Sequence, residues 1–333
     1  MISVVRNVFS QMRALIVLFL LGIVASILSP VFLTPSNLLN VLLEVSVTAL
    51  LAFGQTYIII LAEIDLSVGS VLGLAGAITA GILAHGNIIE ALIVGLLVGA
   101  VSGLINGLLT TFGKIPSFIT TLGTMTAFSG VTLVYTQGNT ISISSNGYAW
   151  IGQGYLLGVP IPVWIMILFY VIFWLLLSRT HYGRYVFATG GNEEASRLSG
   201  ISVRWIKILA FVLTGVLAAV AGFISTARLN TAEPTLGSGL ELDAIAAVIL
   251  GGTSLAGGKG GLFGTLVGAI ILGVLDDGMN LLNVSAFYQG IAKGVIILLA
   301  VLLDRNIHSI SKLGRYVNFS GIHKSAPVKG MKK

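Results

Sequence analysis

The sequence predicts an all-α integral membrane protein with about ten transmembrane helices, and three observations support this fold class. Apolar residues make up 56% of the 333 residues, and the mean hydropathy is +1.00. Only 9% of the residues are charged, whereas about 25% are charged in an average soluble domain. Apolar runs of roughly 20 residues, the length that crosses a bilayer core, recur along the chain. Because so little charge could not cover the surface of a soluble protein, we expect lipid to surround most of the chain.

The apolar runs give the expected spanning helices, and turn-forming residues such as Thr34-Pro35 separate several of them. Only Glu63–Asp65 separates the second run from the third, which allows one of these two helices to be broken or re-entrant. The first run has no small-residue cleavage site, so we interpret it as a retained helix rather than a signal peptide. The expected helices are 14–33, 44–62, 66–84, 89–111, 117–136, 161–178, 206–229, 240–257, 262–282 and 286–304.

Basic residues predict the orientation of these helices. With the N-terminus in the cytoplasm, all 18 Lys and Arg residues except Arg228 and Lys293 fall in cytoplasmic segments or tails. Because cytoplasmic loops carry an excess of Lys and Arg, we expect both termini to be cytoplasmic. This asymmetry also explains the net charge of +6, so no nucleic-acid partner is predicted. We expect a single transmembrane domain over 1–305, with a loop over 179–207, followed by a basic cytoplasmic tail over 306–333.

Two sequence matches predict an inverted five-helix repeat. Gly95–Ala100 in the fourth expected helix matches Gly264–Ala269 in the ninth, and Glu63–Asp65 before the third matches Glu241–Asp243 in the eighth. Both offsets are an odd number of helices, so the two halves would cross the membrane in opposite directions, as in many transporters. Glycine-rich apolar helices can also match by chance, but two matches at one offset weigh against that interpretation.

The sequence offers no catalytic machinery. There is no cysteine, which excludes disulfides, thiolate metal sites and cysteine nucleophiles. Gly251–Lys259 resembles a phosphate loop, but Thr253 replaces its first glycine and Gly260 replaces the hydroxyl residue after the lysine. We therefore expect no enzyme, no metal site and no cofactor, so that any ATP must be bound by another subunit. The isolated histidines are His85, His181, His308 and His323.

The predicted inner loop 179–207 contains the signals of a short helix. Asn192 is a good N-cap, and Glu193 and Glu194 suit the positive end of a helix dipole. Gly200 suits a left-handed C-terminal cap. The expected apolar side consists of Ala195, Leu198 and Ile201. A short capped amphipathic helix of this kind could dock a partner protein, or it could rest on lipid.

Three stretches carry a resemblance to a known family. They read YGRYVFATGGNEEASRLSGISV over 182–203, STARLNTAEPTLGSGLELDAIAAVILGGTSLAGGKGG over 225–261, and IDLSVGS over 64–70. The chain resembles the permeases of bacterial ribose and related monosaccharide ABC importers, over about 37–305. The resemblance implies an all-helical ABC importer permease fold in the bacterial inner membrane. It also implies transport of a ribose-type sugar into the cytoplasm by a non-enzymatic subunit.

The same resemblance implies partners and a coupling site. The expected complex has two permeases, identical or related, two cytoplasmic ATPases that bind the ATP, and an extracytoplasmic sugar-binding protein. In this family a helix of the inner loop contacts the ATPase, and here that helix would contain Gly190, Gly191, Asn192, Glu193, Glu194, Ala195, Leu198, Gly200 and Ile201. One departure is Ala62-Glu63, where many relatives have Gly-Gly or Ser-Gly. A carboxylate near the membrane is costly unless it is paired or hydrated.

Four polar residues are candidates for a low-affinity sugar pathway: Asp65, Ser67, Asn106 and Asn280. Interhelical hydrogen bonds are an equally good interpretation of each. The main functional alternative is an ion-coupled secondary sugar transporter, in which Asp65 or Lys293 would carry protons. An inverted repeat would suit that alternative, whereas the capped inner helix and its motif weigh against it.

Two basic residues in the outer half have predicted roles. Arg228 is expected to contact the sugar-binding protein, with an internal pair to Glu233 or Glu241 as the alternative. Lys293 lies at the same expected depth as Asp276 and Asp277 on a neighbouring antiparallel helix. We expect a structural ion pair with one aspartate, and we expect the other to face water. The alternative is that Lys293 extends to the outer interface without a partner.

Overall fold

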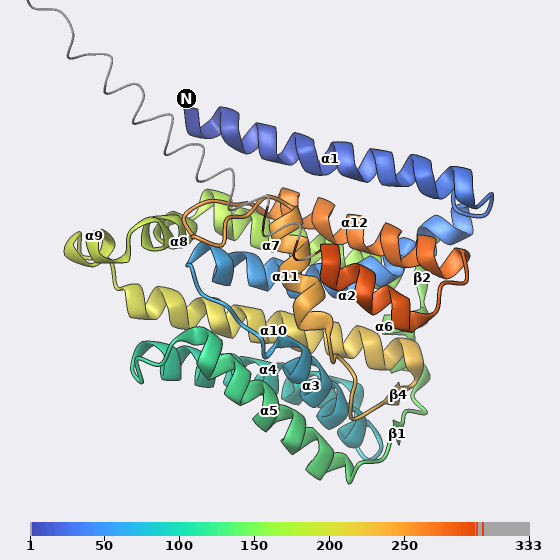
Figure 1. The fold of residues 1–333 in the computed structure, drawn as a ribbon. Coiled ribbons are helices and arrows are strands. Elements are labelled where there is room, and N and C mark those ends of the chain that lie inside the picture. Colours follow the sequence, from blue (N-terminus) through green and yellow to red (C-terminus); the bar gives the residue numbers. More distant parts are fainter. Residues whose placement is uncertain (1, 297, 299–301, 303–333) are drawn as a thin grey trace, which may run out of the picture.

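Helices form nearly all of the regular structure in the computed structural model, which describes residues 2–296, 298 and 302. The helices are α1 (Ile2–Leu28), α2 (Pro35–Ile60), α3 (Val68–Leu83), α4 (Ile88–Thr111), α5 (Ser117–Thr136), α6 (Asn146–Gln153), α7 (Ile161–Arg179), α8 (His181–Gly191), α9 (Glu193–Leu198), α10 (Val203–Leu229), α11 (Leu240–Leu250) and α12 (Leu262–Leu281). Residues 286–296 are also helical. Most of the long helices lie side by side, with α1 along the outer side of α12 (Figure 1).

Six of the described helices are long and apolar enough to cross a membrane: α2, α4, α5, α7, α10 and α12. Residues 14–28 of α1 and the whole of α3 are shorter apolar helices. The expectation of an all-helical membrane protein therefore holds at this level. The last expected helix, 286–304, ends beyond the continuously described residues, and the expected tail 306–333 lies outside them.

Three expected helix boundaries were wrong. The first helix ends at Leu28 rather than near Leu33, because the residue before Pro30 disfavours helical geometry. The second begins at Pro35 rather than near residue 44, because proline fits the first turn of a helix. The eighth, expected over 240–257, ends at Leu250. A glycine-rich turn over 251–261 follows it, and four of its glycines take positive φ angles, which a helix does not allow.

The core is centred on α2 and α10. Every residue from 49 to 60 in α2 is buried, and α10 packs against α2, α3 and α4. The contact between α4 and α10 is made by backbone. A methyl group at Gly99 would collide with the carbonyl of Gly215, and one at Gly103 with the carbonyl of Phe211. Small residues allow this approach in lipid, where no hydrophobic force draws helices together.

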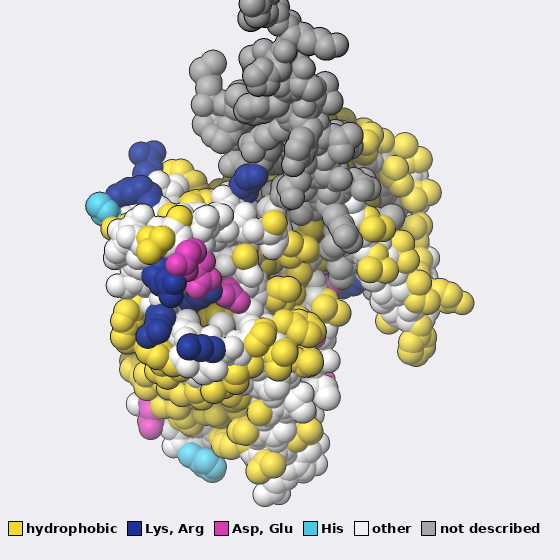
Figure 2. Space-filling model, turned by 60° about the vertical axis from the view of Figure 1, so that its left-hand side comes forward, with side chains coloured by type: hydrophobic (Ala, Val, Ile, Leu, Met, Phe, Trp, Pro, Cys, Tyr) yellow, Lys and Arg dark blue, Asp and Glu magenta, His cyan; other side chains and the backbone are white. Residues whose placement is uncertain are grey.

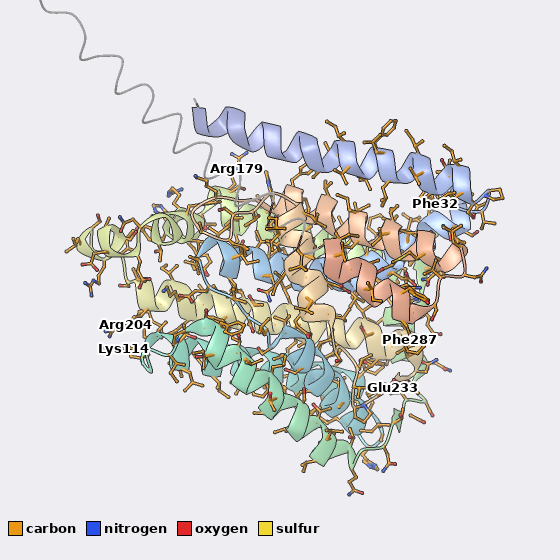
Figure 3. All side chains as sticks on the ribbon, viewed as in Figure 1. Phe32, Lys114, Arg179, Arg204, Glu233 and Phe287 are labelled. Carbon is orange, nitrogen blue, oxygen red and sulfur yellow. The ribbon has the colours of Figure 1, made fainter. Side chains whose placement is uncertain are left out.

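The bundle has two different ends (Figure 1). At one end, here called the α9 end, α8 and α9 project from the bundle, and Figure 3 shows Lys114 and Arg204 there. The opposite end holds α6 and two short two-stranded antiparallel sheets. One sheet pairs β1 (Ile141–Ser142) with β4 (Thr231–Ala232), and the other pairs β2 (Tyr155–Leu156) with β3 (Val159–Pro160). These elements occupy the expected outer loop 137–160 and the segment after α10.

Candidate functional site

The short helix predicted within 190–201 is present as α9, and both of its predicted caps form. The Asn192 side chain accepts a hydrogen bond from the Ala195 N–H at 2.9 Å, and Gly200 has φ +83°. In α9 only Ser196 is buried, and Leu198 is 79% exposed. The apolar residue of this helix therefore does not pack on its own bundle. A contact between Leu198 and an ATPase stays a prediction.

The two glutamates at the start of α9 have different partners. Glu194 pairs with Arg197 one turn along the same helix, and both carboxylate oxygens accept from the guanidinium at 2.7 Å. This contact raises the pKa of Arg197 above its usual value, but both groups are largely exposed, so the pair adds little stability. Glu193 reaches instead to α10, where its Oε2 lies 2.8 Å from the Nζ of Lys207.

Lys207 also pairs with Glu63, which lies in the break between α2 and α3. The Nζ of Lys207 is 2.6 Å from Oε1 of Glu63, and the two side chains are 11% and 14% exposed. Glu63 is thus neither free nor simply hydrated at an interface. In this largely buried position, the ion pair offsets the desolvation cost that a lone carboxylate would have. Sequence reasoning missed this partnership, although both charges were visible in the sequence.

The loop over 179–207 also meets the end of α2 through backbone. A methyl group at Gly190 would collide with the carbonyl of Ile60, and that carbonyl accepts from the Gly258 N–H at 2.8 Å. Gly257 and Gly258 both have positive φ angles, which suit glycine. The run that resembles a phosphate loop is therefore a packing turn. It joins α11 to α12 and lies against the Gly190–Gly191 junction.

A cavity of about 370 Å³ opens at the α9 end beside the ion pairs of Lys207 with Glu63 and Glu193. Figure 2 turns this end forward and shows basic and acidic side chains gathered around a hollow, with an apolar band below. The charged residues that line the cavity are Glu63, Lys114, Glu193, Arg197, Arg204 and Lys207. The guanidinium of Arg204 lies 5.3 Å from the ring of Phe112, so a cation–π contact joins α10 to the end of α4.

Three of the four expected pathway residues lie together at the break between α2 and α3. Asp65 Oδ1 accepts from the N–H and the hydroxyl of Ser67 at 2.8 and 2.7 Å. Asn106 of α4 donates to the Ser67 hydroxyl at 2.7 Å and accepts from Thr124 of α5 at 2.6 Å. Asp65, Ser67 and Asn106 are each no more than 2% exposed. The geometry is therefore that of the interhelical hydrogen bonds given above as the alternative.

The fourth expected pathway residue, Asn280, does not join this group. It is exposed near the far end of α12, where its Oδ1 accepts from the side chain of Gln289 at 2.8 Å. A role of Asn280 in the sugar pathway stays a prediction. Hydropathy placed Asn280 in a spanning helix, but it did not show that α12 carries this residue to the opposite end of the bundle.

Lys293 lies between two carboxylates. Its Nζ is 2.9 Å from Oδ2 of Asp276 on α12 and 3.0 Å from Oδ2 of Asp243 on α11. The pair with Asp276 was one of the expected contacts, whereas Asp243 was missed. The expectation that the other aspartate faces water was wrong. Asp277 is 9% exposed and accepts from Asn37 at 2.7 Å.

Arg228 at the end of α10 pairs with Glu44 of α2 at 3.3 Å, and the two side chains are 39% and 40% exposed. Neither of the internal partners named in the alternative, Glu233 or Glu241, makes this pair. Figure 3 shows Glu233 at the opposite end from α9, the end at which α10 finishes. The guanidinium is half-exposed there, and a contact with a binding protein stays a prediction.

Comparison with known proteins identifies the family. A family model described as "Branched-chain amino acid transport system / permease component" matches residues 37–301.

The chain belongs to this permease family.

It is 52% identical to the ribose import permease protein RbsC of Bacillus subtilis (strain 168), over 90% of this chain and 94% of that protein. It is 50% identical to the protein of the same name from Escherichia coli (strain K12), over 88% and 93%. It is 40% identical to the D-allose transport system permease protein AlsC of Escherichia coli (strain K12), over 87% and 90%. No solved structure matches the chain.

The family predicted from the IDLSVGS and ATGGNEEASRLSG motifs is therefore confirmed. A permease of this family is a transporter subunit and not an enzyme. Its several apolar helices make it a multi-pass membrane protein. The residues described above are therefore those of a transport protein, which moves a solute rather than changing its bonds.

Proposed function

We propose that this permease is the transmembrane subunit of an ATP-driven importer that brings a ribose-type monosaccharide into the cytoplasm. One observation carries the proposal. Two ribose import permease proteins are 52% and 50% identical to the chain over about nine-tenths of its length. Relatives named for D-allose and L-arabinose are 40% and 38% identical. Ribose is therefore the first sugar to test.

We propose that the α9 end faces the cytoplasm, because the basic residues of the loops gather there and cytoplasmic loops are rich in Lys and Arg. Both termini would then be cytoplasmic. The proposed arrangement has about ten spanning helices, related by an inverted repeat of five. Two copies of this chain, or this chain and a paralogue, would form the membrane part of the importer within the bacterial inner membrane.

The proposed partners are a sugar-binding protein and two ATPase subunits, which dock at opposite ends of the permease. A sugar-binding protein docks at the opposite end, where Arg228 is half-exposed, and two ATPase subunits dock at the α9 end. ATP is bound by those subunits, and we expect no cofactor in this chain. Exposed Leu198 and the capped α9 suit insertion into a groove of the ATPase. ATP-driven closure of the ATPases would then rock the helices between outward-facing and inward-facing states.

The test is reconstitution in liposomes. Permease, ATPase and binding protein together should accumulate labelled ribose only when ATP is present on the ATPase side. Unlabelled allose and arabinose should compete more weakly than unlabelled ribose.

A matched control tests the alternative function, an ion-coupled secondary transporter. The permease alone, with a proton or sodium gradient and no ATPase, should take up no ribose. Gradient-driven uptake by the chain alone would overturn the ATP-driven proposal.

A further inference from the structure

Lys207 lies where three parts of the permease meet: α9, α10 and the break between α2 and α3. It is on the second turn of α10, and its Nζ contacts Glu193 at 2.8 Å and Glu63 at 2.6 Å. The Lys207 and Glu63 side chains are 11% and 14% exposed, whereas Glu193 is 58% exposed. The contact therefore begins on a helix that projects into solvent and ends inside the bundle.

Such a contact resists separation. Removing one partner from a largely buried ion pair leaves a desolvated charge, which is strongly unfavourable. If α9 moves without Lys207, Glu193 loses its cation. If Lys207 follows α9, its largely buried partner Glu63 must follow as well, or that pair breaks. The other ion pair of α9, between Glu194 and Arg197, closes within the helix and transmits nothing to the bundle.

Glu63 is connected in turn to two further helices. The next residue, Ile64, donates its N–H to the Ser117 hydroxyl of α5 at 3.1 Å, and Leu66 donates to Thr121 of α5 at 3.0 Å. Asp65 holds Ser67, and Ser67 accepts from Asn106 of α4. A displacement of Glu63 would therefore pull on a segment whose backbone is fastened to α4 and α5 through buried polar groups.

A second contact of the same loop is made by backbone rather than by charged side chains. The Gly190–Gly191 junction touches the backbone of Ile60 and of the 251–261 turn without any intervening side chain. Such backbone contacts leave little room for sliding, which suits a pivot. Further along the same loop, Glu193 of α9 pairs with Lys207 of α10, and Lys207 pairs with Glu63.

From this geometry we infer that Lys207 is a positioning residue that carries movement of α9 to the break between α2 and α3. The inference rests on the proposed function, because it assumes that a partner ATPase moves α9. Glu63 is then the receiving end of the connection. The polar cluster of Asp65, Ser67 and Asn106 is what the movement reaches.

The experiment compares hydrogen exchange in two segments of the complete importer in lipid nanodiscs, with and without a non-hydrolysable ATP analogue. In the wild type, both 190–201 and 61–67 should change their exchange when the nucleotide binds. In Lys207→Met, 190–201 should still respond and 61–67 should not. In the same variant, ribose transported per ATP hydrolysed should fall about tenfold, a size usual for coupling between two sites.

Two further variants keep the result interpretable. Lys114→Met removes a cation from the same cavity, and among the described residues Lys114 makes no ion pair, so this variant should behave like the wild type. Glu63→Gln keeps the shape of the side chain and the contact between Lys207 and Glu193, and it should reproduce the loss at 61–67. It also serves where Lys207→Met fails to fold.

The outcomes separate this inference from the proposed function. If 61–67 responds normally and the transport ratio is unchanged in Glu63→Gln or in folded Lys207→Met, Lys207 does not carry the movement. The proposed function would then still stand, because 190–201 responds to the nucleotide. If 190–201 fails to respond in the wild type, the ATPase does not act through α9 and this inference is overturned, whereas the proposed function is decided by ATP-dependent ribose uptake in liposomes.

Discussion

The ammonium group of Lys293 lies 2.9 Å from the carboxylate of Asp276, and it joins the helix that contains residues 286–296 to α12. Asp243 of α11 contacts the same ammonium at 3.0 Å. Three helices thus share one cation that is 24% exposed. A cation so placed neutralises two carboxylates that would otherwise repel each other in a poorly hydrated region.

Lys293→Met should therefore destabilise the permease, because it leaves Asp276 and Asp243 without their cation. We expect a loss of about 2 kcal/mol, below the 3–5 kcal/mol of fully buried pairs because all three side chains are partly exposed. Thermal unfolding followed by tryptophan fluorescence in detergent would measure it. Adding Asp276→Asn should recover part of the loss. A melting temperature equal to that of the wild type would exclude a structural role for the pair.

Leu198→Asp should abolish ribose-stimulated ATP hydrolysis while leaving the permease folded. Leu198 is 79% exposed and does not pack on its own bundle, so the substitution has little to disturb within the chain. An aspartate, however, would be costly in an apolar groove of the ATPase. Hydrolysis by the reconstituted complex is the measurement, and Leu198→Met is the matched control that keeps an apolar side chain. Normal stimulation in Leu198→Asp would refute the predicted contact.

Arg228→Glu should weaken association of the sugar-binding protein. The Arg228 side chain is 39% exposed at the proposed docking end, and acidic residues on the partner would be repelled by the new carboxylate. Association can be measured by surface-based binding at two salt concentrations. The double variant Arg228→Glu with Glu44→Arg restores an ion pair between α10 and α2, so it controls for a local structural effect. Equal affinity of the binding protein for the wild type and for Arg228→Glu would show that Arg228 does not contact it, and would leave the ion pair with Glu44 as the role of this residue.

Two glycines provide a paired test of helix packing. Gly103→Ala should destabilise the bundle by about 1–3 kcal/mol, because its methyl group would meet the backbone of Phe211 on α10. Gly123→Ala on α5 has open space around its new methyl group and should stabilise the helix by about 0.5–1 kcal/mol. Melting temperatures of both variants in one detergent make the comparison. A similar shift for both would contradict the close approach of α4 and α10.

Local features of the sequence predicted local structure well. Asn192 and Gly200 identified the caps of α9, because capping depends on residues only a few positions apart. Depth counting from the turn before residue 286 brought Lys293 to Asp276, because both distances are short along the chain. Composition and the recurring apolar runs of about 20 residues were enough to predict a helical membrane protein.

Contacts between distant segments could not be predicted in the same way. The hydrogen bond from Asn37 to Asp277 joins residues 240 positions apart, and the ion pair between Glu63 and Lys207 joins residues 144 positions apart (207 − 63). Hydropathy shows which residues are in a spanning segment, but it does not show which neighbouring helix they face. Hydropathy therefore did not show that Asn280 lies apart from the other three candidates, whereas Asp65, Ser67 and Asn106 lie together because the α2–α3 break, α3 and α4 are consecutive along the chain.

Asn106→Leu tests whether the polar cluster at the α2–α3 break serves only the fold. Leucine has a similar size, but it would remove the bonds to Ser67 and Thr124 and leave both hydroxyls with one partner fewer. Since each buried polar group that loses its partner costs about 1–3 kcal/mol, the melting temperature should fall. Asn106→Asp keeps an acceptor for Thr124 but places a second carboxylate near Asp65, so it should be less stable still. If the role is purely structural, the folded fraction of Asn106→Leu should transport ribose at the wild-type rate per ATP hydrolysed. A reduced rate at normal hydrolysis would instead place the cluster in the sugar pathway.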